Sequence, residues 1–211
     1  MLMWPGLRSV REARLRAHVC GDGHLYVEVG RRGKRYVVEY TNSSLELINE
    51  FINDAIYEYN VSPIIIKHKE VFIARFKSRY AFHRLALLKA GKSKEWRAPL
   101  RIFLVADTAK ATELMKNWLR AFMDDEAHID LSTGRVTITS VNYQGLLDIK
   151  DMLNYLGIKS KIYRILRGYA YKLVISKREN LCRLFSMITP LHPQKLMRSR
   201  KILLMCKALK G

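Results

Sequence analysis

The chain carries an internal repeat, and this repeat limits the possible architectures more than any other feature. Leu15-Arg16-Ala17 recurs as Leu119-Arg120-Ala121, 104 positions later, and Asp22 corresponds to Glu126 at the same offset. The period is several times longer than the unit of a solenoid. The sequence therefore predicts two copies of one half-domain rather than an array of short repeats.

Both copies have the same predicted order of elements, α-β-β-α-β-β-α. Helices are expected where apolar residues recur with helical spacing, as at Leu114, Trp118 and Phe122, and strands where apolar and polar residues alternate. The expected helices span about 9–21, about 43–59 and from about 78 in the first copy, then about 108–126, about 142–157 and from about 176. The expected strands span about 24–29, 34–40, 64–67 and 71–76, then about 128–131, 135–139, 161–165 and 169–175. The predicted fold class is α+β, with antiparallel strand pairs.

We divide the chain into an N-terminal half (1–90), a linker (91–106), a C-terminal half (107–190) and a basic tail (191–211). The linker is assigned from the run of small and basic residues that begins at Gly91. The tail carries six Lys or Arg and neither Asp nor Glu. A segment of this composition favours phosphate, so we expect an additional DNA or RNA contact there.

The charge of the chain points to a polyanionic partner. It has 38 Lys and Arg against 19 Asp and Glu, which gives a formal net charge of +19. A surplus of this size is typical of proteins that bind nucleic acids. The hydrophobic share of 49% excludes intrinsic disorder. Because no apolar run reaches the roughly 18 residues of a membrane span, we expect no membrane partner.

The cysteines predict the redox setting. Cys20, Cys182 and Cys206 are far apart and odd in number. Their spacing fits neither a disulfide framework nor a paired zinc site. We therefore expect a reducing, cytoplasmic location, with the protein at the prokaryotic nucleoid when it is bound there. Cys20 is expected to be a small buried hydrophobic residue.

Each copy places one carboxylate directly after its first helix, Asp22 in the first copy and Glu126 in the second. If these helices pair, the small residues Ala17 and Gly21 allow close contact, and the two carboxylates emerge together. Like charges at short range repel unless a cation neutralises them. Oxygen ligands of this kind suit Mg²⁺, with Mn²⁺ as the other candidate cofactor. Paired carboxylates that hold a divalent ion beside a nucleic-acid backbone are typical of phosphodiester hydrolysis.

The segments 15–23 and 119–127 resemble the paired motifs of the LAGLIDADG homing endonucleases, in the single-chain, two-motif form of the archaeal intron-encoded members. The resemblance covers about residues 8–190. It implies two pseudo-two-fold related halves whose antiparallel sheets form a saddle over the DNA major groove. It also implies site-specific cleavage of both strands that leaves 3′ overhangs. Cys20, Asp125 and Ala127 depart from the motif, and Asp125 could loosen the helix contact or face solvent.

The resemblance also implies roles for individual residues. Asp22 and Glu126 become the metal-binding acids, and the backbone carbonyls of Gly21 and Asp125 complete the coordination. Residues near the ends of the second and fourth strands of each half hold water and phosphate; these are Asn42, Asn142, Lys77 and Lys177.

The expected partner is double-stranded DNA with an asymmetric target site, because the two halves differ, and the expected state is a monomer. Base contacts are expected from strand residues, namely Tyr26, Glu28, Tyr36, Tyr40, Arg75, Arg135, Thr137 and Thr139. Phosphate contacts are expected from basic residues of the first hairpin tip and other strands, namely Arg31, Arg32, Lys34, Arg35, Lys67, Lys69 and Lys172. On the opposite strand face, Leu25, Val27 and Val29 are expected in the core.

Other functions stay open at this point. A protein of the same fold could bind intron RNA as a maturase or DNA as a non-catalytic regulator, and a basic ribosome-associated protein is a third possibility. His24 and His128 occupy matching places in the two copies, which suits DNA contact more than a general base. Cleavage assays with and without Mg²⁺ distinguish the nuclease from the binding proteins.

Overall fold

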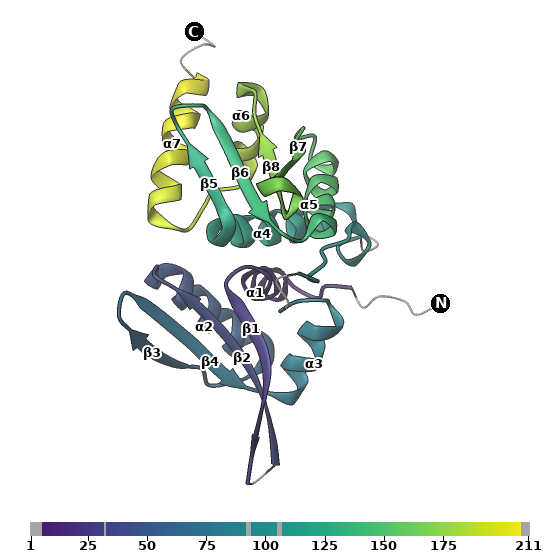
Figure 1. The fold of residues 1–211 in the computed structure, drawn as a ribbon, viewed down its shortest axis with the longest axis vertical. Helices are drawn as coiled ribbons and strands as arrows, with labels where there is room; N and C mark the ends of the chain where they lie inside the picture. Colours follow the sequence, from purple (N-terminus) through teal and green to yellow (C-terminus); the bar gives the residue numbers. More distant parts are fainter. Residues whose placement is uncertain (1–5, 32, 92–93, 105–106, 208–211) are drawn as a thin grey trace.

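The computed structural model describes residues 6–31, 33–91, 94–104 and 107–207 and contains two similar halves (Figure 1). The first half has a four-stranded antiparallel sheet in the order β1-β2-β4-β3, and the second has a sheet in the equivalent order β5-β6-β8-β7. Helices α1 (Val10–Cys20) and α4 (Thr108–Glu126), one from each half, lie side by side between the sheets. The predicted α+β class and the repeated α-β-β-α-β-β-α order are confirmed.

The elements lie close to their predicted bounds. The rest of the first half comprises β1 (Gly23–Gly30), β2 (Gly33–Asn42), α2 (Leu45–Tyr59), β3 (Ile64–His68), β4 (Val71–Lys77) and α3 (Arg79–Leu87). The rest of the second comprises β5 (Ala127–Asp130), β6 (Arg135–Ser140), α5 (Tyr143–Tyr155), β7 (Lys161–Ile165), β8 (Ala170–Ile175) and α6 (Arg178–Met187). Short 3-10 turns lie at Leu100–Ile102 and Leu166–Gly168, and α7 (Pro193–Lys207) follows α6.

Hydrogen bonds of the Ser9 and Glu12 side chains cap the start of α1. Ser9 Oγ accepts a hydrogen bond from the Glu12 amide at 3.0 Å, and the Glu12 carboxylate accepts one from the Arg8 amide at 2.8 Å. Glu12 is fully buried, and Arg84 of α3 donates to its two oxygens at 2.6 and 2.9 Å. Because this buried charge is paired, α1 is held against α3 and enters the interface between the halves in a defined position.

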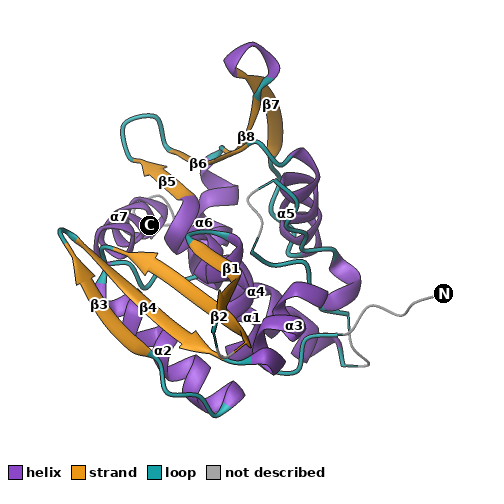
Figure 2. Cartoon of the chain, turned by 60° about the horizontal axis from the view of Figure 1, so that its bottom comes forward, coloured by secondary structure: helices purple, strands orange, loops and turns teal. Residues whose placement is uncertain are grey.

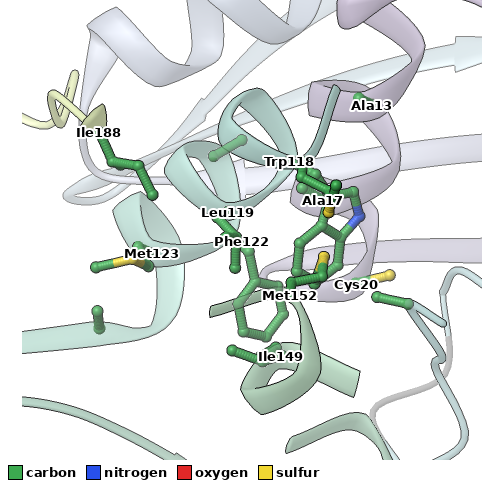
Figure 3. Packing of buried hydrophobic residues seen from close by; sticks show 14 of the residues in the cluster. Ala13, Ala17, Cys20, Trp118, Leu119, Phe122, Met123, Ile149, Met152 and Ile188 are labelled. Atoms are coloured by element: carbon green, nitrogen blue, oxygen red, sulfur yellow. The ribbon is translucent and has the colours of Figure 1, made fainter. Parts of the chain in front are cut away.

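Small residues bring α1 and α4 together. Ala13 and Ala17 of α1 are fully buried at the contact. Beside them, Trp118 stacks on Phe122 with ring centroids 4.9 Å apart (Figure 3). Trp96, from the segment that joins the halves, packs on Phe122 at 4.8 Å. The core is therefore continuous across the two halves, and the joining segment contributes to it.

The hairpins that follow α1 and α4 differ in length. β1 pairs with β2 over eight residue pairs, whereas β5 pairs with β6 over four. β2 pairs with β4 only from Val37 onward, so the far part of the first hairpin extends beyond its sheet (Figure 1). Val27 and Val29 are therefore 39% and 78% exposed, and the prediction that they lie in the core is wrong.

The C-terminal segment is a packed helix. α7 lies against α6 and β5, and its Cys206 forms a disulfide with Cys182 of α6. The prediction that the chain has no disulfide is wrong, because the packing of two neighbouring helices, and not the spacing of the cysteines, brings this pair together. Cys20 is buried and free, as expected. Within the described ranges, no helix has the length and apolar character that a bilayer crossing requires.

Candidate metal site and nucleic-acid surface

The two helix ends that carry the predicted acids meet at the interface between the halves. Gly21 ends α1, its amide donates to Ala17 O at 3.0 Å, and Asp22 follows it. Glu126 is the last residue of α4. A Cβ placed on Gly21 would lie 2.8 Å from the Cβ of Asp125, so these two positions are in direct contact. The missing side chain at position 21 makes room for Asp125, which is why the helices stay close despite that bulky residue.

The acids at these helix ends affect one another electrostatically. Partial desolvation raises the pKa of Asp22 to about 6, and the negative charge of Asp125 contributes in the same direction. Desolvation raises the pKa of Glu126 to about 7, with further contributions from Asp22 and Asp125. The mutual effects indicate that three carboxylates share a small volume in which their negative charge is incompletely balanced.

This arrangement fits a divalent ion. Mg²⁺ is commonly held by one or two carboxylates and keeps several waters, which leaves coordination positions for a phosphate oxygen. Asp22 and Glu126 supply such a pair, and a cation there would relieve their repulsion. Among the residues that the structure describes, no three His, Cys, Asp or Glu side chains form a complete protein-only metal site. The donors therefore suit an ion shared with a phosphate rather than a structural metal.

The side chain of Asp125 belongs to a buried network. Its carboxylate accepts a hydrogen bond from the Tyr40 hydroxyl at 2.6 Å and lies 2.9 Å from His18 Nδ1. His18 is fully buried, and its Nε2 lies 3.3 Å from the Glu50 carboxylate. Burial alone lowers the pKa of His18, but Asp125 and Glu50 together raise it to about 9. The imidazolium form is therefore present at neutral pH, and it balances the buried charge of Asp125.

Two expectations are wrong at this network. Asp125 neither loosens the contact between α1 and α4 nor faces solvent, because the positive charge of His18 and the Tyr40 hydroxyl stabilise its carboxylate inside the protein. Tyr40 is fully buried, so it is not a DNA-binding residue. It lies on the core-facing side of β2, where its hydroxyl reaches the other half of the molecule.

The structure brings Asn42 to the first acid. Asn42 ends β2, and its Nδ2 donates to Asp22 Oδ2 at 3.0 Å. Its Oδ1 accepts a hydrogen bond from the Ser44 amide at 2.9 Å. The side-chain amide is thus held at both ends, and it orients the Asp22 carboxylate.

Asn142 does not have the matching position in the second half. It is buried, its Oδ1 accepts from the Gly145 amide at 2.9 Å at the start of α5, and its Nδ2 donates to the Trp96 carbonyl at 2.6 Å. The shorter second hairpin is the reason, because the strand pairing makes Ser140, the last residue of β6, the counterpart of Asn42. The predicted catalytic role of Asn142 therefore has no support in its geometry.

Neither predicted lysine lies beside the acids. Lys77 ends β4 and lies about 10 Å along the sheet from the strand ends that adjoin Asp22. Its Nζ lies 3.7 Å from the Glu28 carboxylate. Lys177 follows β8 and lies near the β5–β6 turn. Both strands begin at the end of the sheet nearest the acids and run away from it, so the prediction selected the wrong strand ends.

A lysine of α7 lies beside the acids instead. Lys195 Nζ donates to the carbonyls of the last residues of α4 before Glu126, at 3.0 Å for Met123 and 3.1 Å for Asp125, and it also contacts the carbonyl between them. The carbonyl of Asp125, expected to bind metal, is therefore occupied by an ammonium group. Sequence analysis missed Lys195 because its partners lie about 70 positions earlier, and no local pattern marks such a contact.

One face of the first sheet carries predicted DNA-binding residues. The strand register puts Tyr26, Glu28, Arg35 and Arg75 on this face, together with Glu39. Arg75 lies 2.6 Å from Glu39 and 3.9 Å from Glu28, so ion pairs organise the surface. Figure 2 shows this sheet with α1 and α2 behind it.

Other residues assigned to DNA binding in this half lie elsewhere. Tyr36 is on the opposite face of β2 and packs against Phe82 and His83 of α3, with ring centroids 5.3 and 4.9 Å apart, so it is not placed for the predicted base contact. The basic residues of the two hairpin turns and nearby strand positions are exposed; these are Arg31, Lys34, Lys67 and Lys69. Arg32 lies outside the described residues.

The second sheet has an equivalent face, which carries Arg135, Thr137 and Thr139 of β6 and Lys172 of β8. His128 lies on this face, as His24 lies on that of the first sheet, and both are exposed. His24 and Asp22 also line an open groove of about 730 Å³. A nucleic-acid backbone on these sheet faces would have access to the first acid through this groove.

Comparisons with known proteins agree with this geometry. A family model described as a LAGLIDADG-like domain matches residues 113–189. The homing endonuclease I-DmoI, in a complex with DNA and Ca, aligns over 88% of this chain and 95% of its own, with a TM-score of 0.67 and 22% identity. The homing endonuclease I-WcaI bound to its DNA recognition sequence aligns over 92% of this chain and 88% of its own, with a TM-score of 0.61 and 14% identity.

A relative in sequence is the probable translation initiation factor IF-2 of Thermococcus kodakarensis, which is 37% identical over 90 residues. That match spans 43% of this chain and 7% of the relative, so it concerns a small part of a much longer protein. At 14–22% identity, the structural likenesses establish the fold. Residues 113–189 are therefore similar to a LAGLIDADG-like domain, and the chain as a whole has the fold of the homing endonucleases I-DmoI and I-WcaI.

Proposed function

We propose that the protein is a site-specific DNA endonuclease of the homing type, which hydrolyses both strands of a duplex with divalent ions held by Asp22 and Glu126. The observation that carries the proposal is the meeting of these acids, one from each copy of the repeat, where α1 and α4 end. I-DmoI, which shares the fold, is known in complexes with DNA together with Ca, Mn or Mg. We infer Mg²⁺, or Mn²⁺, as the cofactor and 3′ overhangs as the product.

The chain's own residues have distinct tasks in this reaction. A bound divalent ion would activate water and stabilise the charge that develops on the scissile phosphate. Asp22 and Glu126 come from opposite halves, so each DNA strand would have its own acid to hold an ion. Asn42 orients the Asp22 carboxylate through the 3.0 Å hydrogen bond. His18 lies 2.9 Å from the Asp125 carboxylate and holds it behind the acids, away from the ligand positions.

Charge and shape favour a DNA duplex as the substrate. The net charge of +19 supplies phosphate affinity that weakens with salt. Two-stranded β-ribbons fit the major groove, and each half presents one sheet face with polar and charged side chains. Because the halves differ and are joined in one chain, a monomer suffices for an asymmetric target. A protein with this substrate would act in the cytoplasm, at the nucleoid.

Cleavage of a plasmid library that carries randomised duplex inserts tests the proposal. In Mg²⁺ the protein should cut one family of related sequences and leave 3′ overhangs, and EDTA should abolish cutting. Asp22→Asn and Glu126→Gln should lose cleavage and keep DNA binding, whereas the control Glu70→Gln, at an exposed acid of the β3–β4 turn, should cut normally. DNA binding without cleavage, in Mg²⁺ and in Mn²⁺, would contradict the proposed nuclease activity. It would favour a DNA-binding regulator or an intron-RNA maturase of the same fold.

A further inference from the structure

The start of α7 is attached to the second motif. The Asp124 carboxylate accepts hydrogen bonds from the Leu191 amide at 2.9 Å and from the His192 amide at 3.1 Å. Asp124 is almost completely buried, and Arg120 Nη1 lies 3.2 Å from it. Asp124, a residue of the second motif, therefore fixes the start of α7 next to the end of α4.

The rest of α7 is attached at two further points. Arg198 Nη1 donates to the Ile129 carbonyl of β5 at 3.0 Å. The disulfide between Cys206 and Cys182 ties the last turn of α7 to α6. Lys195 lies between these attachments, so its backbone has little freedom to move away from α4.

Lys195 is fixed at the negative end of α4. Its ammonium group donates to the carbonyls of Met123 and Asp125 at 3.0 and 3.1 Å. The Asp125 carbonyl is one of those that have no intrahelical donor at a helix C-terminus, whereas that of Met123 also accepts the Ala127 amide. It interacts electrostatically with both Asp22 and Glu126. In the first half, where the chain is described after α3, a 3-10 turn replaces such a helix. The two motifs are therefore chemically unequal, although both place their acid at the end of the first helix of the half.

We propose that Lys195 is a positioning residue that makes the two motifs bind divalent ions unequally. Its ammonium group occupies the Asp125 carbonyl, which leaves the Glu126 carboxylate as the ligand of the second motif. It also places a fixed positive charge beside the ion position, which weakens the binding of a divalent cation there. The inference rests on the proposed function, because it assumes that Asp22 and Glu126 bind metal.

Calorimetric titration of the full-length chain with Ca²⁺ alone, at pH 8, tests this inference. In the wild type, binding should depend mainly on Asp22. Lys195→Met should bind a second ion, lower the half-saturating Ca²⁺ concentration about tenfold, and lose the second ion when Glu126→Gln is added. Lys201→Met, at an exposed lysine of the same helix, is the matched control and should titrate like the wild type.

A second variant separates the charge of Lys195 from its contribution to folding. Lys195→Gln keeps an N–H donor for the α4 carbonyls but removes the charge, so its thermal unfolding should resemble the wild type while Ca²⁺ binds more tightly. Unchanged Ca²⁺ binding in Lys195→Gln, with wild-type binding still lost in Asp22→Asn, would overturn the inference and leave the proposed function intact. Ca²⁺ binding that survives loss of both acids would overturn the proposed function itself.

Discussion

Replacement of Asp125 by Asn should flatten the pH dependence of stability above neutrality. Burial alone would lower the pKa of His18, but Asp125 and Glu50 raise it to about 9, against about 6.5 in an unfolded chain. A group whose folded pKa is raised contributes its full stabilisation below the unfolded pKa and loses it as the pH rises through the folded one. The difference corresponds to about 3 kcal/mol in total, of which about 2 kcal/mol is lost between about pH 7.5 and about pH 10.

Guanidinium unfolding at about pH 7.5 and about pH 10 measures this loss. The free energy of unfolding should fall by at least about 1 kcal/mol less in Asp125→Asn than in the wild type, because a neutral amide does not favour the imidazolium. Cys20, whose pKa burial raises to about 11, titrates in both proteins, so its contribution cancels in the comparison. The interval begins above the pKa values of Asp22 and Glu126, about 6 and about 7, so their titration does not contribute. The Tyr40 hydroxyl can still donate to the amide oxygen, which preserves the fold. Equal losses of the free energy of unfolding in the wild type and in Asp125→Asn would refute the ion pair between His18 and Asp125.

Three further substitutions, with Gly30→Ala as the control for the first, test the geometry of the site and its support. Gly21→Ala should destabilise the protein by about 1–3 kcal/mol in denaturant unfolding, because its Cβ would lie 2.8 Å from the facing side chain of α4. Gly30→Ala, whose Cβ meets nothing within 4 Å, should change stability by less than about 0.5 kcal/mol. Asn42→Ala should slow single-turnover cleavage about tenfold with unchanged DNA affinity, because it removes the hydrogen bond that orients Asp22; an unchanged rate would exclude this orienting role. Cys206→Ser should lower the free energy of unfolding by about 2–4 kcal/mol, and reduction of the wild type should reproduce that loss.

The helices and the acids were predictable from the sequence because they depend on local pattern. The 19-residue helix α4 has its predicted bounds, and its apolar residues Leu114, Trp118 and Phe122 are buried, since helical spacing alone determines which face is hidden. The offset of the repeat is constant up to the ends of α1 and α4. Asp22 and Glu126 were therefore located correctly relative to those helices.

Predictions that extended the repeat beyond the first hairpin were less successful. A difference in hairpin length leaves each strand with its normal alternation, so nothing in the local pattern reports it. Asn142 and Lys177 were paired with Asn42 and Lys77 by order along the chain, whereas the strand register assigns other counterparts.

Apart from the pairing of the two motif helices, contacts between distant segments could not be predicted from the sequence. Tyr40 fits the alternating pattern of a strand, and nothing in that pattern indicates that its hydroxyl donates a hydrogen bond to Asp125 in the other half. Lys195 belongs to a segment whose composition suggests a nucleic-acid-binding tail, and only the attachment of α7 reveals its position beside the acids. The Cys182–Cys206 disulfide depends on the same packing.

The unequal hairpins have a consequence for the sequence that the protein would recognise. A strand advances about 3.4 Å per residue, close to the spacing between base pairs along one DNA strand. The eight residue pairs of the first hairpin can therefore follow a groove about twice as far as the four of the second. The DNA footprint should therefore be asymmetric about the cleavage position. The half-site covered by the first hairpin should carry most of the sequence specificity, and the other half-site should tolerate more base substitutions.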